Sequence, residues 1–115
     1  DDINYKKANP ENYFILADHI DKLSIDQVSI EDAHCCNDLK LLDHFENSTV
    51  ILGLIAIAKS QIEKVDEVED RIKKALNHIE KKRLVIAPDC GLGLLNSKLA
   101  EAKLKVMCEA VSRIK

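Results

Sequence analysis

Two short stretches of the chain are apolar at almost every position. Residues 49–58 read TVILGLIAIA and residues 84–87 read LVIA, and both are rich in β-branched side chains. They are too short to span a membrane, and their composition favours strands buried on both faces over helices. Pro88 ends the second stretch, because proline has no N–H for a sheet ladder. A third strand is predicted at 27–31, where it ends in Glu31.

Apolar residues at helical spacing occupy the segments around these strands. Helix starts are predicted at 9–11, 37–38 and 96–97, where Asn, Asp or Ser can cap and Pro10 suits a first turn. A further amphipathic helix is predicted at 66–80. The predicted inner faces are Tyr13, Leu16, Ala17, Ile20 and Leu23; Leu41, Leu42 and Phe45; Val65, Val68, Ile72, Ala75, Leu76 and Ile79; and Ala100, Leu104, Met107, Cys108 and Val111.

The charged positions of the last two helices fall on their predicted outer faces. Opposite charges at 69 and 73, and at 70 and 74, form i,i+4 pairs that each stabilise a helix by about 0.2–0.5 kcal/mol. The same spacing places Lys103 and Lys105 on the surface of the last helix and Cys108 in the core.

The order of elements is one helix followed by three β-α units, which predicts an α/β fold with parallel strands. Three parallel strands are few, since such sheets need cover on both faces. The stretch 49–58 has none of the features that protect an edge strand, so strands are expected to be missing. We therefore interpret residues 1–115 as one partial domain, the last three units of a (β/α)8 TIM barrel that takes about 250 residues in full.

Composition narrows the classes of function. The 115 residues carry a net charge of −3 and only 3% aromatic residues, which argues against a nucleic-acid partner. No signal peptide or membrane-spanning run is present, so no membrane partner is expected. Four cysteines without a secretory signal indicate free thiols and a cytoplasmic protein. The chain begins with Asp and not Met, which suggests processing or a piece of a longer protein.

Chemically useful side chains follow two of the predicted strands. Glu31 ends the first strand, and Cys90 follows the third, just before Gly91. The ends of parallel strands are where α/β folds place their sites, although a free cysteine is often only a small buried hydrophobe. A carboxylate and a thiolate together make two zinc ligands, and a catalytic zinc takes about three. The third could come from the segment 34–36 (His-Cys-Cys), for which a surface turn is the alternative interpretation.

Several of these segments, taken in order, resemble the C-terminal end of cobalamin-independent methionine synthase. They are Ile30 and Glu31 after a strand, the strand at 53–55, the segment 83–92 (RLVIAPDCGL), and a helix with MCEA at 107–110. The most specific part is PDCGL at 88–92. The resemblance extends over nearly the whole chain and is closest to the short, single-barrel members of the family.

The resemblance implies a zinc-dependent methyl transfer to homocysteine. The family's zinc is held by a His-x-Cys pair, a Glu and a Cys; the Glu corresponds to Glu31 and the last Cys to Cys90. The His-x-Cys pair belongs to a preceding strand, expected just before Asp1. The Asp and His that serve the folate methyl donor correspond to Ala56 and Ala58, so a methylated corrinoid is an alternative donor to methyl-tetrahydrofolate.

Two other interpretations remain at this point. The chain could be a non-catalytic α/β fragment or interaction module derived from the family, since two ligands alone leave most of a zinc shell to water. It could also belong to another branch of the barrel superfamily, such as a tetrapyrrole decarboxylase. The pairing of Glu31 with Cys90 argues against that branch, because a decarboxylase needs no soft thiolate ligand.

Overall fold

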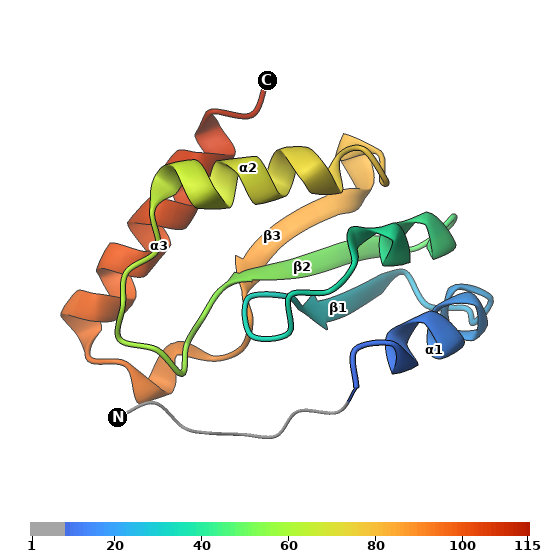
Figure 1. Ribbon diagram of the computed structural model, residues 1–115, viewed down its shortest axis with the longest axis horizontal. Helices are drawn as coiled ribbons and strands as arrows, with labels where there is room; N and C mark the ends of the chain where they lie inside the picture. Colours follow the sequence, from blue (N-terminus) through green and yellow to red (C-terminus); the bar gives the residue numbers. More distant parts are fainter. Residues whose placement is uncertain (1–8) are drawn as a thin grey trace.

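The structure, a computed structural model, describes residues 9–115 and contains one parallel sheet (Figure 1). Its three strands are β1 (Gln27–Glu31), β2 (Thr49–Ile55) and β3 (Leu84–Pro88), and they lie side by side in chain order. Glu31 stands opposite Gly53, which stands opposite Ala87. The α/β class, the parallel pairing and the three predicted strands are therefore confirmed.

Helices alternate with the strands. The α-helices are α1 (Asn12–Asp21), α2 (Val65–Ala75) and α3 (Ser97–Ser112). Short 3-10 turns precede β2, β3 and α3; they are η1 (Leu39–His44), η2 (Lys81–Arg83) and η3 (Leu92–Leu94). The caps follow the prediction at two starts, because Asp38 accepts the N–H of Lys40 and Asn96 accepts the N–H of Leu99.

One face of the sheet carries the core. Helices α2 and α3 pack against each other and cover this face (Figure 1). Val50 and Leu52 of β2 are 0% and 1% exposed, because they meet the apolar stripes of the helices and of η1. The core also contains Ile30, Leu41, Leu42, Phe45, Val68, Ile72, Ala75, Ile79 and Ala110.

The opposite face of the sheet is open along the part of the chain that the structure describes. Ser29, Ile51 and Val85 form one row across the three strands. Ser29 is exposed, Ile51 is half-buried and Val85 is 43% exposed. The prediction that 84–87 is covered on both sides is therefore wrong for this chain, because all the cover lies on the other face.

Helix α1 also differs from the prediction. Its buried residues are Ala17 and Asp21, whereas Leu16 and Leu23 are 51% and 59% exposed. Ile15, beside Leu16, is 69% exposed. The helix packs mainly on η1, so only one narrow side of its apolar surface is in contact and the predicted inner face was too broad.

The inner face of α3 is rotated relative to the prediction. Cys108 is exposed and Val111 is 42% exposed, so neither belongs to the core. Lys103, expected at the surface, is 0% exposed. A buried lysine is rare. Here its apolar stem can pack in the core, and its ammonium group has an acidic partner, Glu63. The stripe of apolar residues that packs inward is Val106, Met107, Ala110 and Ile114.

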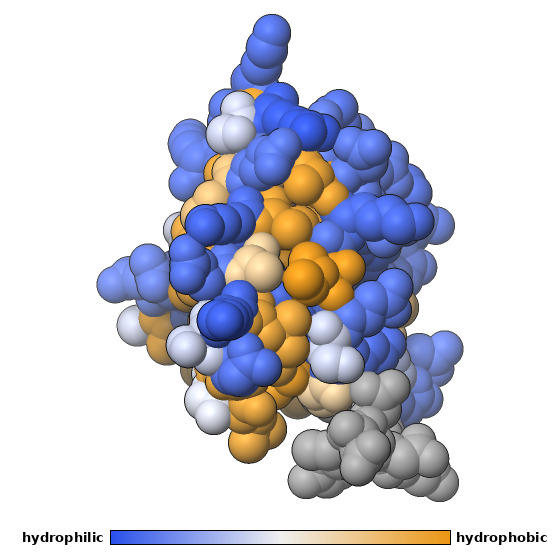
Figure 2. Space-filling view, turned by 90° about the vertical axis from the view of Figure 1, so that its left-hand side faces the viewer, coloured by the Kyte–Doolittle hydropathy of each residue, from blue (hydrophilic) through white to orange (hydrophobic). Residues whose placement is uncertain are grey.

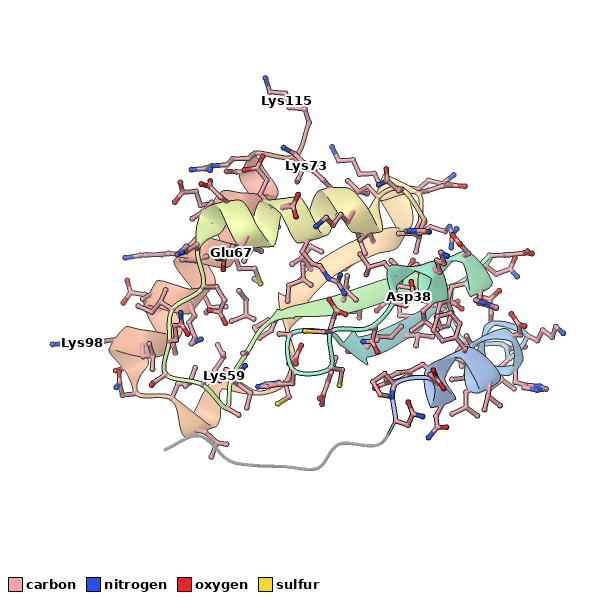
Figure 3. The ribbon with its side chains drawn as sticks, viewed as in Figure 1. Asp38, Lys59, Glu67, Lys73, Lys98 and Lys115 are labelled. Carbon is pink, nitrogen blue, oxygen red and sulfur yellow. The ribbon has the colours of Figure 1, made fainter. Side chains whose placement is uncertain are left out.

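The outer faces of α2 and α3 are charged. The predicted pairs Glu69–Lys73 and Asp70–Lys74 are present at 2.6 and 2.7 Å. In Figure 3, Lys73 on α2 and Lys98 on α3 point away from the sheet. Within residues 9–115, no helix combines the length and the apolar character that crossing a membrane would need.

Candidate functional site

The three strands end at the same edge of the sheet, where the left-hand loops of Figure 1 begin. Strand β1 delivers Glu31 to this edge, and β3 delivers Asp89 and Cys90 directly after Pro88. Parallel strands always bring their carboxyl ends together, so residues distant in sequence meet here. The prediction that Glu31 ends the first strand and Cys90 follows the third is consistent with this arrangement.

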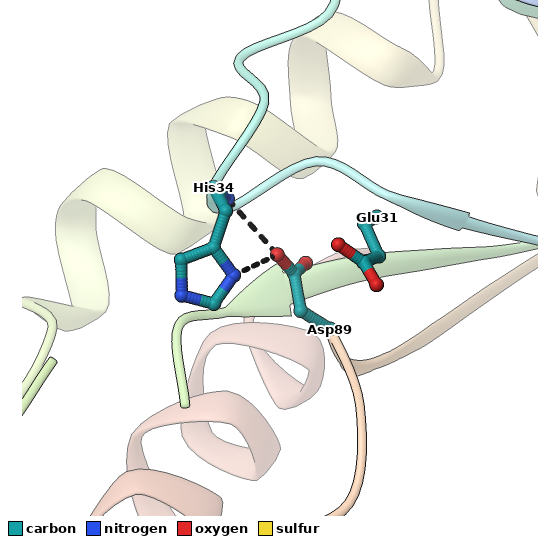
Figure 4. A group of neighbouring side chains, drawn as sticks. All are labelled: Glu31, His34 and Asp89. Carbon is teal, nitrogen blue, oxygen red and sulfur yellow. Dashed lines mark hydrogen bonds and ion pairs between the residues drawn. The ribbon is translucent and has the colours of Figure 1, made fainter. Parts of the chain in front are cut away.

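Asp89 is the most heavily bonded group at this edge. It is 6% exposed, and its Oδ1 accepts the N–H groups of Asp32 at 3.1 Å and Ala33 at 3.0 Å. Its Oδ2 accepts the N–H of His34 at 2.9 Å and lies 2.6 Å from His34 Nδ1 (Figure 4). The four contacts match the capacity of a carboxylate, which therefore fastens the loop after β1 to the end of β3.

His34 joins this arrangement to the end of β2. Its Nε2 accepts the N–H of Ala58 at 3.3 Å, which assigns the hydrogen of the neutral ring to Nδ1 and makes Nδ1 the donor to Asp89. Ala56 and Ala58 have left the sheet ladder, since the N–H of Ala56 donates to Glu63 at 2.9 Å. Strand β2 accordingly ends at Ile55, three residues earlier than predicted.

The close approach of Asp89 to β2 requires a glycine. A Cβ on Gly53 would lie 2.5 Å from Asp89 Oδ1 and 2.7 Å from Asp89 Cα. Both distances are far inside van der Waals contact, and the second involves backbone that cannot move aside easily. Gly53 in the middle of an apolar strand is thus explained by the carboxylate that lies across it.

Glu31, His34 and Asp89 form a group whose possible ligand atoms all lie within 4.8 Å of one another (Figure 4). Such a group could in principle hold a cation. However, both ring nitrogens of His34 and both oxygens of Asp89 already make hydrogen bonds. Metal binding by either His34 or Asp89 would break these bonds.

The cysteines are placed less tightly. Cys90 is exposed beside Asp89, Cys35 is half-buried and Cys36 is exposed. Among residues 9–115, no cysteine joins a compact group of three possible ligands. Of the three candidates for an additional ligand in 34–36, His34 is the one that joins the compact group with Glu31. Cys36 adopts a left-handed φ of 48° in the turn that follows.

The loop after β1 is also fastened to α2. Arg71 donates to Asp32 with Nε at 2.7 Å and Nη2 at 2.8 Å, and Nη2 also reaches the carbonyl of Asn37 at 2.7 Å. Hydrogen bonding to Asp32 raises the pKa of the Arg71 guanidinium, which therefore stays charged at physiological pH and holds the carboxylate with two hydrogen bonds. The loop carrying Glu31 is thus held at both ends.

The loop after β2 is held by α3. Lys103 Nζ donates to both carboxylate oxygens of Glu63 at 3.0 Å and to the carbonyl of Gln61 at 2.7 Å. Glu63 in turn accepts the N–H of Ala56. This chain of contacts explains why Lys103 is buried, and it fixes the path of the loop at 56–64.

Two surface features adjoin the site. A cavity of about 330 Å³ lies between the loop after β1 and α2, lined by residues that include Cys36, Lys59 and Arg71 but not Glu31 or Cys90. Figure 2 looks at the left-hand side of Figure 1 and shows a band of apolar side chains between hydrophilic ones. The loop after β2 and η3 carry Ile62 and Leu94, which are 45% and 73% exposed.

Asp89 and His34 are the residues of this site whose roles the sequence did not reveal. His34 was expected either as a metal ligand or in a surface turn, and Asp89 only as part of the motif at 88–92. A small residue in the middle of an apolar strand was the available signal, since Gly53 indicates that another group approaches the backbone there.

Comparison with known proteins shows similarity along nearly the whole chain. Residues 7–113 match the family described as cobalamin-independent synthase, catalytic domain. Methionine synthase of Pyrococcus abyssi is 38% identical over 101 residues, covering 87% of this chain and 30% of that protein. Methionine synthase of Pyrococcus furiosus is 33% identical over 105 residues, covering 90% of this chain and 31% of that protein.

A solved structure supports the same similarity in three dimensions. The B12-independent methionine synthase of Shewanella sp. W3-18-1, in complex with selenomethionine, superimposes with a TM-score of 0.82 at 26% identity. The match covers 87% of this chain and 29% of that chain. The present chain therefore spans under a third of the length of the relatives that it matches.

Proposed function

Because the chain belongs to the cobalamin-independent methionine synthase family, we propose that it forms part of a zinc-dependent enzyme that transfers a methyl group to homocysteine. The observation that carries this proposal is the meeting of Glu31 with the Asp89–Cys90 strand end at one edge of a parallel sheet. Its product would be methionine, and its setting the cytoplasm, where the free thiols of this chain would remain reduced.

Glu31 and Cys90 are the proposed zinc ligands of this chain. A carboxylate oxygen and a thiolate sulfur are donors that zinc accepts, and Glu31 is held in a compact group of possible ligand atoms. The remaining donors, a His and a Cys, would come from strands that residues 9–115 do not contain. A zinc ion held there would supply the positive charge that keeps a substrate thiol deprotonated and nucleophilic.

The proposed fold of the complete enzyme is a (β/α)8 TIM barrel. The open row Ser29, Ile51 and Val85 supports it, because the inner face of a barrel strand is covered only when the other strands are present. The exposed apolar side chains of α1 support it in the same way. The large share of each relative that lies outside the match leaves room for the missing units.

The methyl donor is proposed to be methyl-tetrahydrofolate or a methylated corrinoid. Ala56 and Ala58 leave the end of β2 without an acidic or basic side chain of its own. The imidazole of His34 contacts the end of this segment, where its Nε2 accepts the N–H of Ala58. Its Nδ1 is hydrogen-bonded to Asp89. A donor that needs no proton from the end of β2 is therefore favoured.

A graft tests the proposal. Residues 7–113 replace the matching segment of the Pyrococcus abyssi methionine synthase, and methionine formation from homocysteine is measured with each of the two donors. We expect activity with at least one donor and its loss in the Glu31→Gln graft. A folded graft that binds zinc yet forms no methionine with either donor would instead support a non-catalytic module.

A further inference from the structure

We infer that Asp89 is a positioning residue for the proposed zinc site, holding the loop after β1 so that Glu31 stays oriented beside the strand end that bears Cys90. This inference rests on the proposed function for the identity of the ligands. It assigns to Asp89 a role different from that of a metal ligand.

The contacts of Asp89 are of a kind that fixes backbone. Three consecutive N–H groups, those of Asp32, Ala33 and His34, converge on one carboxylate at 2.9–3.1 Å. Hydrogen bonds to an ionised carboxylate are about twice as strong as neutral ones, and here they are sheltered from water. A loop held by three such bonds has little freedom to rotate about the end of β1.

The two proposed ligands are covalent neighbours of this anchor. Glu31 directly precedes Asp32, and Cys90 directly follows Asp89. The bonds between residue 89 and residues 32–34 are therefore a short connection between the two donors, which lie on strands that do not pair with each other. Any loosening of the anchor changes how the Glu31 carboxylate is presented to Cys90.

Asp89 has no remaining capacity as a ligand. Its two oxygens accept three backbone N–H groups and the ring N–H of His34. Gly53 has no side chain, so the carboxylate of Asp89 packs directly against the backbone of β2, which fixes its distance from the sheet. The carboxylate of Asp89 is therefore better explained as a support for the loop than as a metal ligand.

The chain contains a matched control for this anchor at the opposite end of the sheet. Asp21 is 8% exposed and accepts the N–H groups of Glu46, Asn47 and Ser48 at 3.0, 3.2 and 2.9 Å. Ser48 directly precedes β2, so this second carboxylate fixes a loop far from Glu31. Asp21→Asn and Asp89→Asn remove the same kind of interaction, one away from the site and one beside it.

The test is a residue-resolved Zn²⁺ titration, by ¹H–¹⁵N NMR, of the graft of residues 7–113 described above, followed at the amides of Glu31 and Cys90. Groups that orient a metal ligand typically contribute about 10–100-fold to affinity. We expect Asp89→Asn to weaken Zn²⁺ binding by about that factor and Asp21→Asn to leave it unchanged. Equal Zn²⁺ affinities in the two variants, whether unchanged or weakened, would overturn the inference.

Hydrogen exchange provides a second measurement that needs no zinc. The N–H of His34 has Asp89 as its acceptor, so this amide should be protected in the wild-type chain and exchange faster in Asp89→Asn. If Zn²⁺ shifts neither Glu31 nor Cys90 in the graft without substitutions, the proposed function fails while hydrogen exchange still measures the anchor. An unprotected His34 amide in the wild-type chain would contradict the anchor itself.

Discussion

At the scale of single residues, the site depends on small side chains as much as on charged ones. Gly53 has no Cβ to collide with Asp89. Ala58 donates its backbone N–H to Nε2 of the His34 ring. Glu31 and Cys90 supply the proposed chemistry, but their mutual orientation depends on these neighbours. A substitution that adds a single methyl group can therefore disturb the edge of the sheet.

Gly53→Ala is the substitution that tests this most simply. The new Cβ would lie 2.5 Å from Asp89 Oδ1, and overpacking of this kind destabilises proteins by about 1–3 kcal/mol. We expect a lower midpoint in urea denaturation. Gly93→Ala is the control, because a Cβ there meets nothing within 4 Å. An equal midpoint for the two variants would show that Asp89 does not press on Gly53.

The residues of the site were only partly predictable. Glu31 was identifiable because it ends a strand, and Cys90 because it follows one. The bonds of Asp89 and His34 were not, because they join positions that lie about 55 residues apart. Periodicity within a segment carries no information on such contacts, and a glycine shows that something approaches but not what it is.

At the scale of elements, buried charges decide how loops and helices are joined. Lys103 of α3 lies in the core because Glu63 and the carbonyl of Gln61 receive its ammonium group. Asp21, at the end of α1, is buried where three N–H groups of the loop before β2 reach it. In both cases a polar side chain stands where a helical stripe would place an apolar one.

Lys103→Met should destabilise the chain by about 3 kcal/mol, because it leaves the Glu63 carboxylate largely buried without its partner. Lys105→Met should leave the free energy of unfolding nearly unchanged, since that lysine pairs with Glu101 in solvent. Urea denaturation measures both. Adding Glu63→Gln to Lys103→Met should restore part of the loss; no recovery would show that the carboxylate is not the cause.

The buried carboxyl of Asp21 predicts that the stability of the folded chain depends on pH. Burial alone would raise the pKa of its carboxyl, but the hydrogen bonds from Ser48, Glu46 and Asn47 lower it from 3.8 to about 2. A folded pKa below the unfolded value means stability that is present above pH 4 and is lost as the pH falls towards 2. The amount is up to about 2 kcal/mol.

Unfolding free energies measured between pH 5 and pH 2 should therefore fall less steeply in Asp21→Asn than in the wild-type chain. Asp70→Asn, which alters an exposed i,i+4 pair on α2, is the control and should keep the wild-type slope. Parallel curves for the wild-type chain and Asp21→Asn would show that the unfolded chain holds this proton equally tightly.

The elements themselves were largely predictable from the chain. The strand at 27–31 has the predicted bounds, and the capping residues at 38 and 96 are the predicted ones. The faces of α1 and α3 were predicted less well. The inner stripe of a helix was inferred from apolar residues alone, so Lys103 was placed outside, and Leu16 and Cys108 were placed inside.

At the scale of the whole molecule, the helices of the described residues cover the sheet on one face only. The core lies between one face of the sheet and α2 and α3, while the row through Ile51 and Val85 and the apolar side of α1 are left uncovered. The sequence could show that three parallel strands are too few. It could not show which face lacks cover, because strands apolar on both faces look alike.

Zinc content of the grafted enzyme tests the central claim most directly. Metal analysis compares the graft carrying Cys90→Ser with the same graft carrying Cys108→Ser, whose thiol is exposed on α3. We predict about one zinc per chain in the unaltered graft and in Cys108→Ser, and loss of most of it in Cys90→Ser, because catalytic zinc sites need about three protein ligands. Equal zinc content in the two variants would contradict the assignment of Cys90 and the proposed function built on it.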